Sequence, residues 1–204
     1  MILPTAYFPS IFQFALAIQN GGYELACKEH FVKQSYRNRC EIYGANGMQK
    51  LVVPLKKWGN HTPIEELQLS YAENWQKLHW KSLESAYRAS PFFDFYEEDF
   101  APFFHQKDIR FLLDWNRQLE QTVCELLQIE LSIAKSTSFE DANPDYRKII
   151  SPKNKAIKQA VTFPKYLQVF GDKHGFISNL SILDLLFNLG PETVTYLQKL
   201  KLNL

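Results

Sequence analysis

The 204-residue sequence has few cysteines, no long apolar run and almost no net charge. Its three cysteines, Cys27, Cys40 and Cys124, are widely spaced, which argues against a disulfide framework and a zinc cluster and predicts a cytoplasmic protein without a bound metal. No run of about 18 apolar residues occurs, so no membrane-spanning helix is expected. The 23 Lys and Arg residues balance 22 Asp and Glu residues to a net charge of +1. Any anion must therefore be bound by a local cluster of basic side chains.

Motifs for a cofactor or for nucleic acid are also absent, so neither is expected as a partner. Hydrophobic residues make up 46% of the chain, enough for the core of one ordinary globular domain. In residues 1–70 the pattern is mainly that of strands, with one helix at Ser10–Gln19 that ends before two glycines. Asn46-Gly47 favours a tight hairpin turn, and on the strand before it Cys40 and Ile42 alternate onto one face that is expected to be buried. The expected strands are Ile2–Phe8, Tyr23–His30, Lys33–Tyr43, Gln49–Leu55 and Pro63–Leu69.

In residues 71–204 the apolar period changes to that of helices. Ser70 and Glu73 have the spacing of a capping box, and the helix after them is expected to bury Trp75, Leu78, Leu83, Ala86 and Tyr87. Asp108 is expected to cap a second helix that extends to Leu126. A polar loop is expected over about 136–165. Ser181 is expected to cap a short helix that extends to Asn188, and Pro191 to open a last helix. The sequence thus predicts one α+β domain over 1–204, with an N-terminal mixed sheet that contains a β-hairpin and packs on a C-terminal helical region.

Four segments form a specific pattern along nearly the whole chain. They are Tyr7-Phe8-Pro9; Lys33 to Arg39; Trp75 to Tyr87 followed by Pro91-Phe92-Phe93; and Tyr166 to Phe170 leading to Leu180 to Asn188. In this combination they resemble the WbqC-like protein family, bacterial proteins often encoded with O-antigen and capsular polysaccharide genes. The resemblance implies a role in surface-polysaccharide or sugar metabolism and does not define a reaction.

The sequence departs from this family pattern in two places near its start. Pro4-Thr5 stands where many members have Gln-Pro, and Cys27-Lys28 stands roughly where they have two adjacent acids. A metal-binding or proton-accepting role of those paired acids is therefore not carried over to this chain.

The basic residues Lys33, Arg37 and Arg39 alternate along one expected strand, so they are predicted to share a face about 7 Å apart. Two guanidinium groups at that spacing can hold a phosphate or carboxylate. The alternative is a solvated strand face that discourages pairing with other strands. Asn38 lies on the opposite face, and the resemblance singles it out together with Arg39. Its amide is interpreted as a structural bridge or a substrate contact.

His79 falls on the apolar side of its helix, four residues after Trp75. An imidazole titrates near neutrality, so His79 is the candidate for proton transfer, and a core histidine with one hydrogen bond is the alternative. Asp184 and Asn188 lie one helical turn apart, and Gln168 is a third polar residue in an apolar run. One interpretation is that these residues line a pocket. The alternative is that Asp184 caps its helix by satisfying the free amides at the helix start.

The segment from Asn143 to Lys165 carries an excess of basic residues: Arg147, Lys148, Lys153, Lys155, Lys158 and Lys165. It is interpreted either as a lid that orders on an anionic ligand or as a solvated loop. The leading hypothesis is a transferase that binds a phosphate-bearing or other anionic small molecule through Lys33, Arg37 and Arg39. The alternative is a non-catalytic binding or assembly protein of a polysaccharide pathway. The donor, the acceptor and the oligomeric state are not specified by the sequence.

Overall fold

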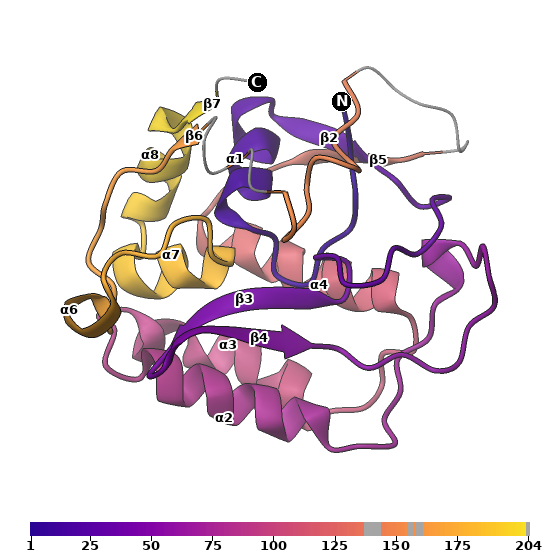
Figure 1. Cartoon of the computed structure of the whole chain (residues 1–204), viewed down its shortest axis with the longest axis horizontal. Helices are drawn as coiled ribbons and strands as arrows, with labels where there is room; N and C mark the ends of the chain where they lie inside the picture. Colours follow the sequence, from indigo (N-terminus) through magenta and orange to yellow (C-terminus); the bar gives the residue numbers. More distant parts are fainter. Residues whose placement is uncertain (137–143, 155–156, 158–160, 203–204) are drawn as a thin grey trace.

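The computed structural model describes residues 1–136, 144–154, 157 and 161–202. Strands lie mainly in the N-terminal half, and helices dominate after residue 70 (Figure 1). This arrangement confirms the predicted α+β fold class. Parallel and antiparallel strand pairs both occur, but they lie in separate small sheets.

The first sheet is parallel and joins distant parts of the chain in the order β1-β2-β5. Its strands are β1 (Ile2–Leu3), β2 (Gly22–Leu25) and β5 (Ser132–Lys135). Gly22 has a φ of +143°, and a Cβ atom there would lie 2.0 Å from the carbonyl oxygen of Ser132. Glycine is thus required where β2 approaches β5.

Helix α1 (Ile11–Gln19) forms the crossover between β1 and β2. Ser10, predicted as the first residue of this helix, is its N-cap, and its side chain accepts a hydrogen bond from the amide of Gln13 at 3.4 Å. The helix is followed by Gly21 and Gly22, both with positive φ. This element is therefore as the sequence indicated.

The second sheet is the predicted hairpin, formed by β3 (Arg39–Gly44) and β4 (Gly47–Val52). Its register runs from Gly44↔Gly47 to Arg39↔Val52. Strand β3 lies between helix α2 on one side and helix α7 on the other, and so Cys40 and Ile42 are fully buried (Figure 1). The hairpin and the burial of Cys40 and Ile42 are confirmed.

The first strand of the hairpin is shorter than predicted, because residues 33–38 form turns. Pairing reaches Arg39↔Val52, and Pro54 then has no amide hydrogen to continue the ladder. The strand predicted at Pro63–Leu69 is also wrong. A short 3₁₀ helix (Ile64–Glu66) and isolated bridges occupy this segment.

Helices α2 (Trp75–Tyr87), α3 (Phe93–His105) and α4 (Leu112–Leu126) follow the hairpin. In α2, Trp75, Leu83, Ala86 and Tyr87 are buried as predicted, but Leu78 is 63% exposed. Asn74, rather than Ser70, precedes this helix, and its side chain makes no capping bond. Helix α3 was not predicted.

Asp108 does not cap α4, which begins three residues later than the predicted capping position implied. The backbone before α4 instead pairs with an earlier segment: the amide of Leu69 donates to the carbonyl of Arg110, and the amide of Leu112 donates to the carbonyl of Leu67, each at 2.9 Å. These contacts hold the chain extended up to Phe111.

The C-terminal part is made of short elements: β6 (Val161–Thr162), α6 (Gly171–His174), α7 (Ile182–Leu189), α8 (Glu192–Lys199) and β7 (Lys201–Leu202). Ser181 caps α7, and Pro191 precedes α8, as predicted. One cluster of buried side chains includes residues from both halves of the chain, among them Leu3, Cys40, Trp115 and Phe187.

Candidate functional site

The three basic residues of the predicted anion-binding face do not share a face in the structure. Because the strand begins at Arg39, the alternation that placed Lys33, Arg37 and Arg39 together is broken by the turns before it. Lys33 is exposed, Arg39 is half-buried, and Arg37 is only 2% exposed. Arg37 thus lies in the turns before the strand rather than on it, and its buried side chain lines a cavity.

Arg37 forms a buried ion pair with Glu29. Its Nε donates to Glu29 Oε1 at 2.7 Å, and its Nη2 donates to Oε2 at 2.5 Å. The same Nη2 lies 3.4 Å from the carbonyl oxygen of Arg147. The side chains of Arg37 and Glu29 are 3% and 5% exposed, so this two-bond contact is shielded from water and geometrically defined.

Burial raises the pKa of the Glu29 carboxyl above its ordinary value. The guanidinium of Arg37, and more weakly that of Arg147, opposes this rise by favouring the charged form. Glu29 is thus a carboxyl group with a raised pKa, and perturbed pKa values are common among the acids and bases of active sites. Glu29 lies just before the turns, next to Cys27-Lys28, where the family pattern has paired acids, and it was not among the residues predicted for the site.

A cavity of about 490 Å³ opens beside this ion pair. Three of its lining residues are basic, and two carry hydroxyl groups. The lining consists of Glu29, His30, Val32, Ser35, Arg37, Arg147, Lys148, Ile150 and Ser151. Its size falls within the range of about 300 to 1,000 Å³ that is usual for small-molecule sites. We refer to it as the Arg37 cavity.

The segment 144–151 forms one wall of the Arg37 cavity and is anchored to the parallel sheet. The amide of Ile2 donates to the carbonyl of Pro144 at 3.0 Å, and the amide of Tyr146 donates back to the carbonyl of Ile2 at 3.1 Å. Arg147 pairs with Asp145 at 2.8 Å. The structure thus brings Arg147 and Lys148 of the predicted lid to Arg37, while Lys155 and Lys158 lie outside the described residues.

Comparison with known protein families places this chain in one of them. The profile of the WbqC-like protein family matches residues 5–156, which include the ion pair and the walls of the Arg37 cavity. The chain belongs to the WbqC-like protein family. It is also 28% identical over 197 residues to "Uncharacterized protein Rv1507c" of Mycobacterium tuberculosis, an alignment that covers 82% of this chain and 84% of that protein. No solved structure matches the chain.

In this WbqC-like protein the predicted catalytic residue His79 lies in the core. It is 6% exposed, its Nδ1 is 3.0 Å from the hydroxyl of Tyr7, and its ring packs edge-on against Trp75. Burial lowers its pKa to about 4, and a contact with the backbone of Val52 opposes this shift. A neutral imidazole held by Tyr7 fits the structural interpretation of His79 better than proton transfer.

Asn38 and Arg39 continue from the turns into the hairpin. The side-chain amide of Asn38 donates to the carbonyl of Val53 at 2.9 Å, while the amide of Val53 donates to the carbonyl of Asn38 at 2.8 Å. Asn38 therefore closes the open end of the hairpin, in agreement with the structural bridge proposed for it. Neither residue lines the Arg37 cavity.

Gln168, Asp184 and Asn188 come together elsewhere in the WbqC-like fold. The Asp184 carboxylate is fully buried and accepts hydrogen bonds from Tyr87 at 2.9 Å, Tyr166 at 2.5 Å and Gln168 at 2.8 Å. Asn188 donates to the backbone carbonyl of Asp184 at 2.7 Å. The predicted capping role of Asp184 is wrong, because its carboxylate bonds distant hydroxyl and amide groups instead of the first amides of α7.

The hydrogen bonds of Asp184 connect α2, α7 and the segment before α6. Burial raises the pKa of Asp184, and the hydrogen bonds that its carboxylate accepts oppose this rise. Gln168 also lines a surface hollow with Tyr166 and Leu167, but Asp184 and Asn188 do not. The three residues are thus assembled as an internal network, at a different place from the Arg37 cavity.

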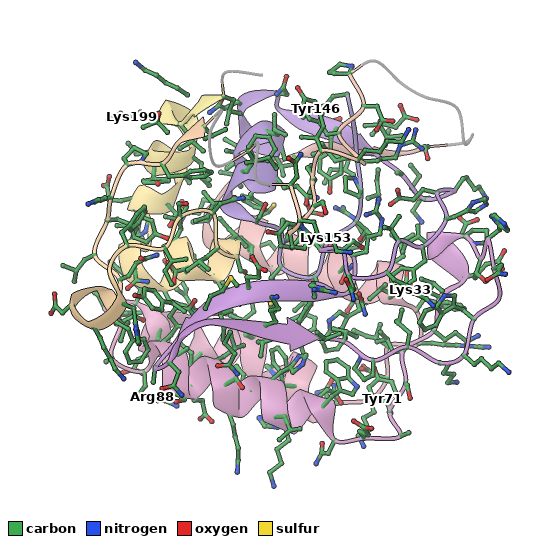
Figure 2. The ribbon with its side chains drawn as sticks, viewed as in Figure 1. Lys33, Tyr71, Arg88, Tyr146, Lys153 and Lys199 are labelled. Carbon is green, nitrogen blue, oxygen red and sulfur yellow. The ribbon has the colours of Figure 1, made fainter. Side chains whose placement is uncertain are left out.

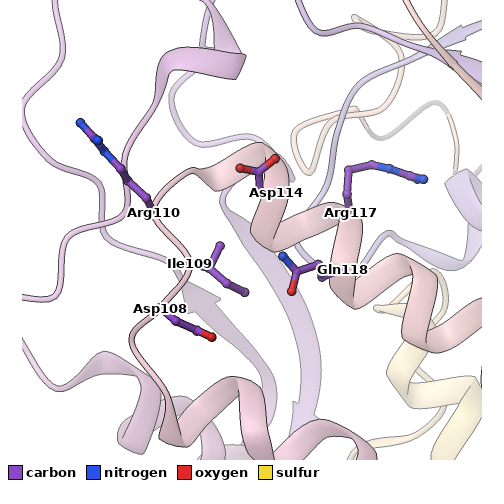
Figure 3. A pocket seen from close by; sticks show the side chains of 6 residues that line it. All are labelled: Asp108, Ile109, Arg110, Asp114, Arg117 and Gln118. Atoms are coloured by element: carbon purple, nitrogen blue, oxygen red, sulfur yellow. The ribbon is translucent and has the colours of Figure 1, made fainter.

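A further hollow of about 450 Å³ lies at the start of α4, and its lining side chains have mixed charges (Figure 3). The side chains of Arg110 and Arg117 point in opposite directions (Figure 3). Arg117 forms an ion pair with Glu120. Because the side chains of Arg110 and Arg117 diverge and Arg117 is paired with Glu120, they do not point toward one common ligand in this hollow.

Metal ligands were not expected, and no cluster of three or more His, Cys, Asp or Glu side chains suited to a metal ion occurs in the part of the chain that the structure describes. The cysteines Cys27, Cys40 and Cys124 are buried and free. Within the same described residues, no helix has the length and apolarity needed to cross a membrane.

Proposed function

We propose that this WbqC-like protein is a transferase that binds an anionic small molecule, bearing a phosphate or carboxylate, in the Arg37 cavity. The proposal depends on one observation: a buried carboxyl group with a raised pKa lies beside basic side chains in a cavity of suitable size. Of the three basic residues predicted to bind the anion, Arg37 lines this cavity, and Lys33 and Arg39 do not. A concave site that contains Arg37 favours a small-molecule enzyme over a docking protein, which would use a flat basic face.

Lys148 is the residue best placed to attract the anion, since it is exposed at the cavity wall. Arg37 is already engaged by Glu29, so its charge is shared between that carboxylate and the ligand. Ser35 and Ser151 add hydroxyl groups to the lining. Lysine at the rim with arginine beneath it is a common arrangement for phosphate binding.

Glu29 is proposed as the proton acceptor in place of His79. In the transfer step an acceptor hydroxyl or amine forms a bond to the transferred carbon, the bond to the leaving group breaks, and the leaving group takes the electron pair. Glu29 takes the proton released by the acceptor, and Arg37 stabilises the carboxylate before that transfer. A carboxyl group with a raised pKa is a stronger base than an ordinary one.

The family resemblance supports a setting in surface-polysaccharide or sugar metabolism, and the free cysteines support the expected cytoplasmic location. We also propose that residues 1–204 act as one domain, because β2 and β5 pair across the two halves and the segment 144–151 completes the cavity.

The binding part of the proposal is tested by a thermal-shift screen of nucleotide sugars, acyl-CoA thioesters and sugar phosphates, followed by titration calorimetry of the best ligand. Lys148→Ala should weaken binding several-fold. Lys199→Ala is the matched control, because Lys199 is an exposed lysine in α8 that does not line the cavity. If no anion stabilises the protein, or if both variants bind like the wild type, the proposal is wrong.

The catalytic part is tested by mass spectrometry of products after incubation of the bound donor with hydroxyl and amine acceptors. Both variants remove a contact of a buried group, so circular dichroism first establishes that each one folds. Folded Glu29→Gln should keep ligand binding and lose transfer, whereas folded His79→Asn should keep measurable transfer. Loss of transfer in a folded His79→Asn, with full activity in Glu29→Gln, would restore His79 as the catalytic residue.

A further inference from the structure

The Arg37 cavity adjoins a second hollow of about 370 Å³ that is rich in rings. It is lined by His30, Phe31, Trp58, Gly59, Asn60, His61 and Thr62. His30 lines both spaces, so the two are neighbours that share one wall. We refer to the second space as the Trp58 hollow. Its position next to a basic cavity suits a ligand that carries both a ring and an anion.

The two spaces are held in a fixed relation by the backbone. The amide of Ile64 donates to the carbonyl of Glu29 at 2.9 Å, and the amide of Phe31 donates to the carbonyl of Thr62 at 3.3 Å. The same short segment, residues 29–31, thus directs the Glu29 carboxylate to one space and the Phe31 ring to the other. Binding groups on both sides are positioned by one set of strand-like contacts.

Trp58 is the ring best suited to stack on a ligand. Phe31 packs edge-on against it with ring centroids 5.2 Å apart, which holds the indole in place. Trp58 is partly exposed, whereas the other three tryptophans are 7% exposed or less. A partly exposed indole supported from one edge is the usual platform for a planar base.

Lys33 and the rim of the hollow add polar groups around this ring. The Lys33 ammonium lies 5.7 Å from the centroid of the Trp58 ring, so this predicted site residue lies beside the Trp58 hollow although it is not part of its lining. Lys33 lies on the opposite side of the molecule from Lys199 (Figure 2). His61 has a φ of +63°, in the left-handed region that few non-glycine residues adopt and that histidine adopts more often than most.

We infer that the Arg37 cavity and the Trp58 hollow together bind one nucleoside diphosphate or its sugar ester, with the base stacked on Trp58 and the phosphates near Lys33 and Lys148. This inference rests on the proposed function and adds the substrate class to it. Asn60 and His61 at the rim are placed to hydrogen-bond the polar edge of a base, since both line the hollow. The ring requirement is what separates this ligand from a simple anion.

The test compares UDP, ADP, GDP and CDP with inorganic pyrophosphate and with the free nucleosides in calorimetric titrations of the full chain. At least one nucleoside diphosphate should bind on the order of tenfold more tightly than pyrophosphate, because stacking adds to the phosphate contacts. The same nucleotide should quench tryptophan fluorescence, and pyrophosphate should not. This second measurement requires no variant, since Trp58 is the most accessible indole.

Two variants then locate the base. Trp58→Ala should weaken the nucleotide on the order of tenfold and leave pyrophosphate binding unchanged, whereas Trp58→Tyr should retain most of the affinity. Lys148→Ala should weaken both ligands. Circular dichroism and melting curves establish that each variant folds.

The outcomes separate this inference from the proposed function. If pyrophosphate binds and no nucleotide binds more tightly or quenches fluorescence, the base site is wrong and the anion site stands. If neither pyrophosphate nor any nucleotide binds, both proposals fail. Quenching that persists unchanged in Trp58→Tyr and Trp58→Ala would place the base elsewhere and overturn the inference.

Discussion

Replacing Arg37 by methionine should strongly destabilise the protein, because it leaves Glu29 buried without its counter-charge. The guanidinium makes two hydrogen bonds to the carboxylate, and both side chains are at most 5% exposed, so water cannot replace the lost contact. Removing one partner of such a pair costs about 3–5 kcal/mol. We expect a loss of that size in the free energy of unfolding of Arg37→Met at neutral pH.

The double variant Glu29→Gln/Arg37→Met should recover most of this loss, because it removes the stranded charge together with its partner. A buried ion pair replaced by well-packed uncharged residues of similar volume is often close to neutral for stability when those residues are hydrophobic, and Gln at position 29 keeps the volume of Glu without its charge. We expect the double variant within about 2 kcal/mol of the wild type. Arg37→Met/Glu29→Gln therefore measures how much of the single-variant loss comes from the uncompensated carboxylate.

The pH dependence has a defined sign. Burial already raises the pKa of Glu29, and in Arg37→Met the opposing guanidinium is gone, so the pKa rises further. A carboxyl group with a raised folded-state pKa stabilises the protein at low pH and loses that contribution as the pH increases through the raised pKa. The gap between Arg37→Met and the wild type should thus shrink from about pH 7.5 to about pH 5.

Urea denaturation followed by tryptophan fluorescence at both pH values measures these differences. The reasoning is refuted if Arg37→Met lies within about 1 kcal/mol of the wild type at neutral pH. It is also refuted if the double variant is no more stable than the single one, or if the gap does not depend on pH.

Three other predictions follow from burial. Burial lowers the pKa of His79 to about 4, so acidification from about pH 6.5 to about pH 4 should remove up to roughly 3 kcal/mol of stability, and His79→Gln should lack this component in urea titrations. Trp75→Ala should cost roughly 3–5 kcal/mol, while Leu78→Ala on the exposed side of the same helix should change stability by less than about 0.5 kcal/mol. Tyr166→Phe removes a hydroxyl that donates to Asp184 and should cost about 1–3 kcal/mol in calorimetric unfolding, with anion binding unchanged.

Each of these three has a result that contradicts it. For His79, it is an identical pH dependence in the variant and the wild type. For Trp75, it is a melting temperature equal to that of the Leu78 control. For Tyr166, it is weaker binding of the anion, which would connect the Asp184 network to the Arg37 cavity.

The sequence by itself determined the elements whose signals are local. The Asn46-Gly47 turn and the alternation around Cys40 and Ile42 identified the hairpin, because both depend on residues that are neighbours in the chain. The cap at Ser181 was found for the same reason, since its side chain bonds an amide two residues away.

Some local sequence patterns are overridden by contacts with residues far away in the chain, and the sequence alone did not show where this happens. The alternation from Lys33 onward looks like strand, but a strand requires a partner, and the pairing segment ends before Pro54. The position of Asp184 suits a cap, but Tyr87 and Tyr166 supply hydroxyl groups that a buried carboxylate must satisfy. Helix α3 was not predicted, although a helix is formed by residues that are close together in the sequence.

The candidate site was decided by tertiary structure. Arg37 was identified from the sequence, but its partner Glu29 and the wall residue Lys148 were not joined to it, because segments 29–37 and 144–151 are separated by about half the chain. They meet because the backbones of Pro144 and Tyr146 hydrogen-bond to Ile2 of β1, which places the basic wall beside the ion pair. The exclusion of water at this meeting point raises the pKa of Glu29, a property that no single segment of the chain has by itself.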